Sequence, residues 1–459
     1  MKTYKVKGLL TGEGFSSNVC VRTDDNGIIS SIDTNSEDLD AQQLNVYALP
    51  GFQNAHSHAF QYAMAGLAER HATNQTPDDF WSWREAMYQL ALTISPDDLE
   101  NIAAMLYAEM LRHGYTNVAE FHYVHHDKAG AKYANLSEMG ERLVAAAKRV
   151  GIGITLVPIF YQKGGFGKAP TAGQRRFISK DLESYLELLS ASEKSTQLYE
   201  HANLAIGIHS MRGVEPSVIA ELAKDGPQNS PFHIHISEQL KETEDSIAYL
   251  GKRPVEWMLE NVEMNDRFHF VHATHLTDAE TDGIAKSGAN VVLCPTTEGN
   301  LGDGIFPLRR FQDQGGKWSI GTDSHIGINP FEELRLLDYG QRLISHKRNT
   351  FYSKEQGDSG LYAYEQVTSA GRKAMNNYSK EYFKVGDYFN AVLIDANAPL
   401  IASSSLDNLA STILYCTDAS MQYGTISHGK LIVKNGRHQE EDRIRANFVK
   451  TMHALGSRR

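Results

Sequence analysis

The chain has 459 residues, with 45 Lys or Arg against 56 Asp or Glu, so its formal net charge is −11 at pH 7. Hydrophobic residues make up 41% and charged residues 22%, which excludes a disordered chain or a low-complexity fibre. The acidic balance disfavours nucleic acid and anionic membranes as partners, because both attract surfaces rich in Lys and Arg. The three cysteines lie far apart without a CxxC pair, and the N-terminal segment lacks the apolar core of a signal peptide, so we expect a cytoplasmic protein without a cysteine-based zinc ribbon.

Short β-like segments separated by turns occupy both ends of the chain. Residues 19–21 and 28–32 are rich in β-branched side chains, and Asn26-Gly27 between them is a turn signal. Near the other end, residues 391–395 and 430–434 have the same character. The two ends therefore predict one small composite β-sandwich domain, formed by residues 1–49 together with 380–459.

The middle of the chain alternates predicted strands with longer helix-like segments, such as 97–113 and 136–150. Eight strands in such alternation is the number that closes a parallel barrel, so we predict an α/β fold with a (β/α)8 TIM barrel over residues 50–379. A doubly wound open sheet is the alternative, but the glycine-rich phosphate loop that it would need is missing. The span is long for a barrel, so long loops are expected near 164–176 and 298–310. The predicted strands cover residues 46–56, 118–122, 154–161, 204–209, 232–236, 268–272, 291–294 and 318–321.

Most of the predicted strands end in a histidine or an acidic residue, and in a barrel these ends meet on one face. His56 and His58 are two residues apart on a strand, so their side chains point the same way and can bind one ion together. His235 and Asp323 would complete a set of four ligands, with a position left for water. Imidazoles and a carboxylate without a thiolate suit one Zn²⁺, Fe²⁺ or Mn²⁺ ion, and zinc is the first choice. Glu238 would then lie over the site as an acid–base group rather than as a ligand.

These motifs resemble those of the amidohydrolase superfamily. The matching segments are residues 49–58 (LPGFQNAHSH), 235–238 (HISE), His272 and 321–324 (GTDS), and the β-rich ends match the composite β domain of that superfamily. Members with two metal ions carry a lysine on the fourth strand, whereas residues 206–212 (IGIHSMR) contain none, so the chain resembles the single-metal deaminase branch. The resemblance implies that Glu238 and Asp323 move protons and that His272 contacts the substrate or the attacking water. The metal ligands that it implies are His56, His58, His235 and Asp323.

Within that branch the sequence is most similar to the formimidoylglutamate deiminases of histidine degradation. The segments that support this are 58–67, 80–84, 120–123, 209–212 and 294–304. The resemblance implies a homodimer that hydrolyses N-formimino-L-glutamate to N-formyl-L-glutamate and ammonia. Arginine forks suit the two carboxylates of this small substrate. The residues that would line its pocket are Gln61, Arg84, Tyr123, His209, Arg212 and His272.

Two other functions stay open at this point. A deaminase of the same branch that acts on a purine, pterin or adenosine-like ring would need an apolar or aromatic pocket and no pair of arginines. A catalytically dead barrel used for binding or assembly is the more distant alternative, although such proteins usually lose metal ligands. The sequence assigns no role to His122, His325 or Lys163.

Overall fold

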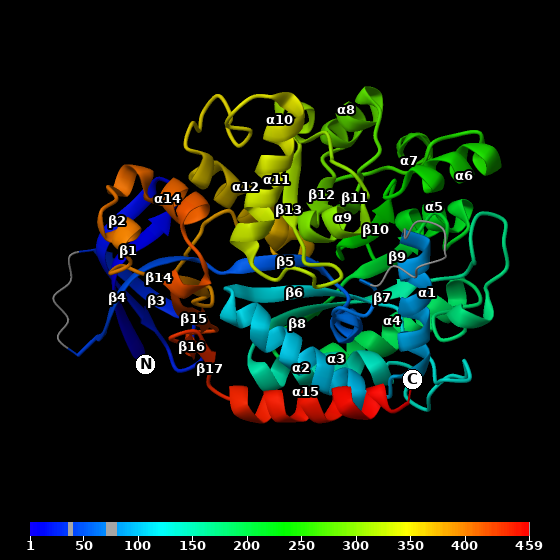
Figure 1. The fold of residues 1–459 in the computed structure, drawn as a ribbon, viewed down its shortest axis with the longest axis horizontal. Coiled ribbons are helices and arrows are strands. Elements are labelled where there is room, and N and C mark those ends of the chain that lie inside the picture. Colours follow the sequence, from blue (N-terminus) through cyan, green and yellow to red (C-terminus); the bar gives the residue numbers. More distant parts are fainter. Residues whose placement is uncertain (35–39, 70–79, 459) are drawn as a thin grey trace.

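Two β-sheets organise the chain in the computed structural model, which describes residues 1–34, 40–69 and 80–458 (Figure 1). One sheet is parallel and forms a nearly closed barrel surrounded by helices. The other lies to one side of the barrel and contains strands from both ends of the chain. The predicted fold class, a TIM barrel with a small β domain built from both termini, is therefore confirmed.

The barrel sheet places eight parallel strands of the described chain side by side. A parallel bridge between Ser57 and Asp323 joins the first strand to the segment after the last. Every residue of β7 (Gly153–Phe160) is buried, as expected for a strand covered on both faces. In sheet order the strands are β5 (Phe52–Ser57), β6 (Tyr115–His122), β7 (Gly153–Phe160), β9 (Ile206–Ser210), β10 (Phe232–Ile236), β11 (Phe268–His272), β12 (Asn290–Leu293) and β13 (Lys317–Ile320), and β8 (Ala202–Leu204) pairs with β7 outside this order.

Helices follow most of the barrel strands and cover the outside of the barrel (Figure 1). The start of α2 (Pro96–Arg112) is encoded locally, because the Ser95 hydroxyl accepts a hydrogen bond from the Asp98 backbone while the Asp98 carboxylate accepts one from the Ser95 backbone. Among the described helices, none combines the length and the hydrophobicity that a membrane span requires. The α-helices are α1 (Phe80–Thr93), α2 (Pro96–Arg112), α3 (Glu138–Val150), α4 (Leu182–Thr196), α5 (Pro216–Asp225), α6 (Leu240–Leu250), α7 (Pro254–Asn261), α8 (Asp278–Ser287), α9 (Pro295–Leu301), α10 (Leu308–Asp313), α11 (Pro330–Ser345), α12 (Ser359–Ala374), α13 (Pro399–Ala402), α14 (Leu409–Cys416) and α15 (Glu441–Gly456), with short 3₁₀ helices η1 (Ala59–Met64), η2 (Ala172–Gln174), η3 (Leu406–Asn408) and η4 (Ala419–Met421).

The small domain is held together by pairing between distant parts of the sequence. β4 (Gln42–Pro50) lies between β1 (Lys2–Thr11), to which it runs parallel, and β14 (Ala391–Asp395), to which it runs antiparallel. Val6, Val46, Leu393 and Ile426, from strands at both ends of the chain, belong to one buried cluster. The strand order is β17 (Arg437–His438), β16 (Lys430–Lys434), β15 (Gln422–Ser427), β14 (Ala391–Asp395), β4 (Gln42–Pro50), β1 (Lys2–Thr11), β2 (Gly14–Thr23) and β3 (Ile29–Thr34).

Two local predictions were wrong. Residues 46–56 were predicted as one strand, but β4 ends at Pro50 in the small domain and β5 begins at Phe52 in the barrel. Gly51 separates them at a crowded point, where an added Cβ would lie 2.3 Å from the Thr116 side chain. The long loop predicted near 298–310 is partly helical, because α9 continues to Leu301 and α10 begins at Leu308.

Candidate active site

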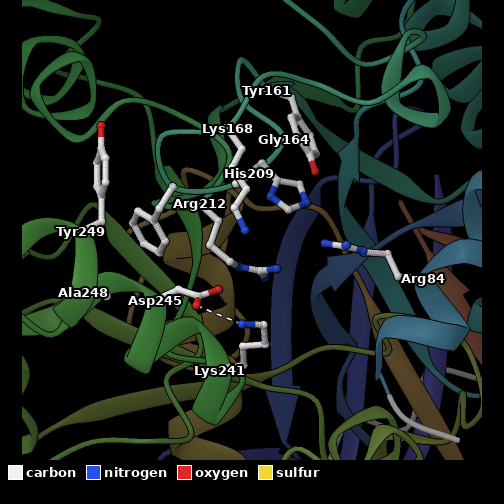
Figure 2. A pocket seen from close by; sticks show the side chains of 12 residues that line it. Arg84, Tyr161, Gly164, Lys168, His209, Arg212, Lys241, Asp245, Ala248 and Tyr249 are labelled. Atoms are coloured by element: carbon white, nitrogen blue, oxygen red, sulfur yellow. Dashed lines mark hydrogen bonds and ion pairs between the residues drawn. The ribbon is translucent and has the colours of Figure 1, made fainter. Parts of the chain in front are cut away.

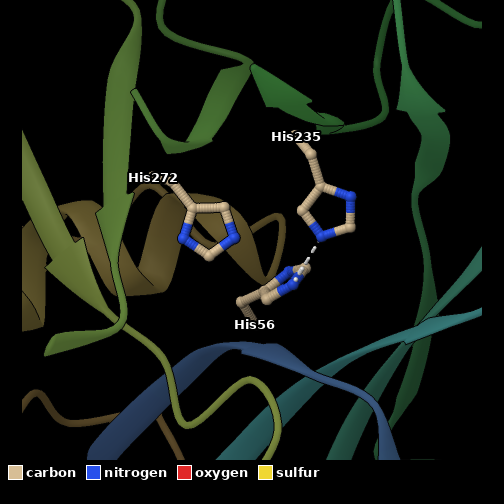
Figure 3. A group of neighbouring side chains, drawn as sticks. All are labelled: His56, His235 and His272. Atoms are coloured by element: carbon tan, nitrogen blue, oxygen red, sulfur yellow. Dashed lines mark hydrogen bonds between the residues drawn. The ribbon is translucent and has the colours of Figure 1, made fainter. Parts of the chain in front are cut away.

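The histidines predicted as metal ligands meet at the carboxyl ends of the barrel strands. His56 lies in β5, His58 follows the end of that strand, and His235 lies in β10. The Nε2 atom of His56 lies 3.1 Å from Nε2 of His58 and 3.0 Å from Nε2 of His235. Figure 3 shows the rings of His56 and His235 directed toward one another, with His272 beside them. Three imidazole nitrogens therefore converge on one buried point.

Hydrogen bonds to backbone carbonyl groups orient two of these rings. His58 donates from Nδ1 to the Phe121 carbonyl oxygen at 2.6 Å, and His235 donates from Nδ1 to the His209 carbonyl oxygen at 2.8 Å. With the proton on Nδ1, each Nε2 presents a lone pair to the common point. Burial lowers the pKa of His56 to about 3 and lowers the pKa of His58 and His235 as well, so the rings are neutral near pH 7. Neutral imidazoles with converging lone pairs are the form that binds a metal ion.

Asp323 adds a carboxylate to this cluster. Its Oδ1 lies 3.3 Å from His58 Nε2 and 3.6 Å from His56 Nε2, and its backbone N–H donates to the His56 carbonyl oxygen. Burial would raise the pKa of Asp323, but its hydrogen bond with His56 and its interactions with the neighbouring histidines, including the protonated His272, hold that pKa well below its usual range. The site therefore offers one ionised carboxylate beside three neutral imidazoles, a donor set that fits one divalent cation.

His272 lies next to this cluster at the end of β11 and is surrounded by carboxylates. Its Nε2 is 3.7 Å from Asp323 Oδ2 and 3.8 Å from Glu238 Oε1, while its Nδ1 is 3.2 Å from Glu298 Oε1. Burial would lower the pKa of His272, but the charge of Glu238 and the other carboxylates raises it to about 10. The backbone of His272 has a φ of +68°, an uncommon value for a residue other than glycine, which aims its ring into the site.

A narrow pocket of about 40 Å³ opens onto this cluster, and all the residues predicted to bind substrate line it. Gln61 comes from η1 and donates to the Tyr123 hydroxyl at 2.9 Å. Tyr123 packs its ring 5.1 Å from the ring of His58, and His209 packs 4.0 Å from the ring of Tyr161. The predicted residues in the pocket lining are Gln61, Arg84, Tyr123, His209, Arg212, Glu238, His272 and Asp323.

Two arginines reach this pocket from different elements. Arg212 follows β9 and is buried, with its guanidinium 3.2 Å from Glu238 Oε2 and 3.7 Å from Glu242 Oε1. Arg84 projects from α1 and lies over the ring of Tyr88 at 5.5 Å. Figure 2 shows the two guanidinium groups directed toward one another across the space between them. The pocket therefore combines a metal-binding donor set with cations suited to carboxylates.

The structure also places the three residues without a predicted role. His122 is buried and faces the outer helices, since a Cβ added to Gly140 of α3 would lie 3.3 Å from its Nε2. His325 is buried with its Nδ1 3.1 Å from the Thr322 hydroxyl, and Lys163 forms an ion pair with Glu215 at 3.7 Å. None of the three lines the narrow pocket within the described part of the chain.

Three buried glutamates support the site, although no role for them follows from the sequence pattern. Glu120 accepts hydrogen bonds from the Ser57 hydroxyl and the Ala59 backbone, which fixes the turn around His58. Glu242 accepts from the Glu238 backbone at 3.0 Å. Glu298 accepts from the Cys294 backbone in addition to its contact with His272. Glu298 lies in a segment that the resemblance singled out, 294–304, but only the contact itself identifies its partner.

Comparisons with known proteins agree with this geometry. The model of the amidohydrolase family matches residues 47–432, so the chain belongs to that family. It is 42% identical to a formimidoylglutamate deiminase of Pseudomonas aeruginosa, over 97% of this chain and 98% of that protein. A 5-methylthioadenosine/S-adenosylhomocysteine deaminase of Haloarcula marismortui is 23% identical over 90% of this chain and 86% of its own length.

Solved structures give the same result. An amidohydrolase from Brucella melitensis superposes with a TM-score of 0.93 at 39% identity, and the match covers 99% of this chain and 100% of that one. An adenosine deaminase from Xanthomonas campestris, solved with bound zinc, superposes with a TM-score of 0.79 at 18% identity over 99% of this chain and 98% of that chain. At that identity the second match supports the fold alone.

Proposed function

We propose that this protein is a formimidoylglutamate deiminase, which hydrolyses N-formimino-L-glutamate to N-formyl-L-glutamate and ammonia. We call His56, His58 and His235 the imidazole cluster. The observation that carries the proposal is that Arg84 and Arg212 line the same narrow pocket as His58 and His235 of this cluster. Fixed guanidinium groups bind carboxylates through paired hydrogen bonds, and this substrate has two carboxylates. The relative that is 42% identical over nearly its whole length is named for this activity.

The proposed metal ligands are His56, His58, His235 and Asp323. Their fit rests on the converging Nε2 atoms and on the Nδ1 hydrogen bonds that leave those nitrogens free to coordinate. We propose Zn²⁺ as the ion, with Fe²⁺ or Mn²⁺ as alternatives that share this donor preference. A divalent ion held here would lower the pKa of the attacking water and so supply hydroxide near neutral pH.

The side chains around the cluster can carry out the proton transfers of the proposed reaction. The water oxygen adds to the formimino carbon, and the Asp323 carboxylate is placed to accept the proton that this water loses. His272, held between carboxylates, is placed to stabilise the charge that develops as the carbon becomes tetrahedral. Glu238 delivers a proton to the terminal nitrogen, the bond from carbon to that nitrogen breaks, and ammonia leaves. The C=O bond of the formyl product forms in the same step, its hydroxyl proton returns to the Glu238 carboxylate, and the proton held by Asp323 leaves with ammonia as ammonium.

The remaining pocket residues hold the glutamate part of the substrate. We assign carboxylate binding to Arg84 and Arg212, and we assign the shape of the pocket to Gln61, Tyr123 and His209. Because Arg212 also lies 3.2 Å from Glu238, a carboxylate bound by this arginine lies close to the proton donor. Such placement keeps the reacting carbon over the metal ligands, and the resulting orientation contributes directly to the rate.

The biological setting is also proposed. The reaction belongs to histidine degradation, and we place the enzyme in the cytoplasm. We propose that it is a homodimer and that its ligand is a small dicarboxylate substrate. The exposed apolar side chains of Leu336, Leu343 and Ile344 on one helix, α11, support association with a second copy. The net charge of −11 argues against nucleic acid or an anionic membrane as a partner. Light scattering during size-exclusion chromatography tests the dimer.

A coupled ammonia assay on the zinc-loaded protein tests the activity. The substrates to compare are N-formimino-L-glutamate, its aspartate homologue, guanidino acids, guanine and adenosine compounds. Release of ammonia mainly from the formimino dicarboxylates supports the proposal. Release from the ring compounds instead would establish the alternative deaminase, and protein that binds metal but releases no ammonia from any of them would contradict both.

A further inference from the structure

A second cavity continues outward from the narrow pocket. It has a volume of about 380 Å³, and Arg84, Tyr161, His209 and Arg212 line both spaces. The narrow pocket has a volume of about 40 Å³, room for about three water molecules. A dicarboxylate whose formimino end reaches the imidazole cluster must therefore extend its other end toward the outer cavity.

Cationic side chains outnumber acidic ones in the lining of the outer cavity. It contains the two arginines, Lys168 and Lys241, together with one acidic residue, Asp245. That acid lies 2.9 Å from the amine of Lys241, as the dashed line in Figure 2 marks, so it offsets that lysine rather than the whole lining. Arg212 is engaged by Glu238 and Glu242. The cavity thus attracts anions, and Lys168 is the lysine of its lining that forms no ion pair within the described residues.

The turn that bears Lys168 has a defined structure. The Gly164 N–H donates to the Lys168 carbonyl oxygen at 3.0 Å, and the Lys168 N–H donates to the Gly165 carbonyl oxygen at the same distance. Phe166 packs its ring 5.8 Å from the ring of Tyr249 on α6, which anchors the turn to the wall of the cavity. Figure 2 shows the Lys168 side chain extending from this turn into the space that Arg212 faces.

We propose that Lys168 binds the side-chain carboxylate of the substrate, the carboxylate farther from the formimino group. This inference rests on the proposed function and adds a subsite to it. Arg84 and Arg212 lie nearer the imidazole cluster and remain for the carboxylate next to the reacting nitrogen. A lysine amine on a flexible stem is a point charge that reaches a distal anion. Lys168 therefore selects dicarboxylates of glutamate length over shorter ones and over monocarboxylates.

The test pairs a change in the protein with a change in the substrate. Lys168→Met and the wild type are assayed with N-formimino-L-glutamate and with N-formimino-L-norvaline, in which a methyl group replaces the distal carboxylate. The variant is expected to lose about fivefold in kcat/KM for the glutamate substrate, the size of a solvent-exposed ion pair, and nothing for the norvaline substrate. Lys168→Arg is expected to restore most of the loss. Lys163→Met is the matched control, because this lysine belongs to the same loop but pairs with Glu215 outside the cavity.

Binding of glutarate and butyrate by calorimetry gives a second readout that needs no turnover. Wild-type protein is expected to prefer glutarate, and Lys168→Met is expected to lose that preference. If Lys168→Met loses kcat/KM equally on both substrates, the lysine supports the structure of the loop and the subsite is overturned. A variant whose ratio of kcat/KM values for the two substrates equals that of the wild type overturns it as well. A wild-type protein that releases no ammonia from N-formimino-L-glutamate would instead refute the proposed function, so the two failures are distinguishable.

Discussion

Arg212 is the residue at which substrate binding and local stability can be tested together. Its side chain is 8% exposed and lies between Glu238 at 3.2 Å and Glu242 at 3.7 Å, and the Glu242 side chain is fully buried. Replacing it by methionine, Arg212→Met, keeps most of the apolar volume and removes the charge and the hydrogen-bond donors. The change leaves both the substrate carboxylate and two buried glutamates without this cation.

The size of the effect follows from these contacts. Truncating one partner of a buried, hydrogen-bonded charge pair costs about 2–5 kcal/mol, so kcat/KM for N-formimino-L-glutamate is expected to fall about 30- to 5000-fold. The free energy of unfolding is expected to fall by about 3 kcal/mol, because Glu242 is left as an uncompensated buried charge. Metal content is expected to stay at the wild-type level, since Arg212 is not one of the proposed metal ligands.

Ammonia release, metal analysis and urea unfolding measure these three quantities separately. The double variant Arg212→Met/Glu242→Gln is the informative control, because neutralising Glu242 should recover most of the stability and none of the activity. If Arg212→Met keeps activity within tenfold of the wild type, the assignment of a carboxylate to this arginine is wrong. Loss of metal from the variant would show instead that the arginine acts on the ligand cluster.

Three further outcomes are expected. Stripping the metal with a chelator should abolish ammonia release and lower the Tm, and added Zn²⁺ should restore both; activity that survives in metal-free protein contradicts the ligand assignment. Glu298→Ala should lower kcat about 10- to 100-fold, because His272 loses the acceptor for its Nδ1 proton. Glu298→Gln should retain much more activity, since its amide oxygen can still accept a hydrogen bond from that Nδ1. If steady-state kinetics show equal losses for the two variants, Glu298 does not position His272. Gly51→Val should lower the free energy of unfolding by about 1–3 kcal/mol, since its side chain would overlap Thr116, and urea titrations that match the wild type would refute that crowding.

The fold class and the residues of the imidazole cluster could both be predicted from the sequence. Apolar strands recur between helix-like segments. This periodicity reflects which residues are buried, so it can be recognised in the sequence before any tertiary contact is known. The spacing of His56 and His58 needs only the two-residue repeat of a strand. The same repeat places Phe121 and Tyr123 toward the site while Glu120 and His122 face the other way.

The contacts that these side chains make with distant residues follow only from the tertiary structure. His56 and His235 are 179 residues apart, and their nitrogens come within 3.0 Å because the barrel closes. The contact of Glu298 with His272 depends on how α9 follows its strand, and the cavity around Lys168 depends on a turn packed against α6. Gly51 lies where one predicted strand divides between two sheets, and an added Cβ there would overlap Thr116 of the neighbouring strand β6. Local patterns specify which face of an element is buried, whereas the register and packing of distant elements specify what it is buried against.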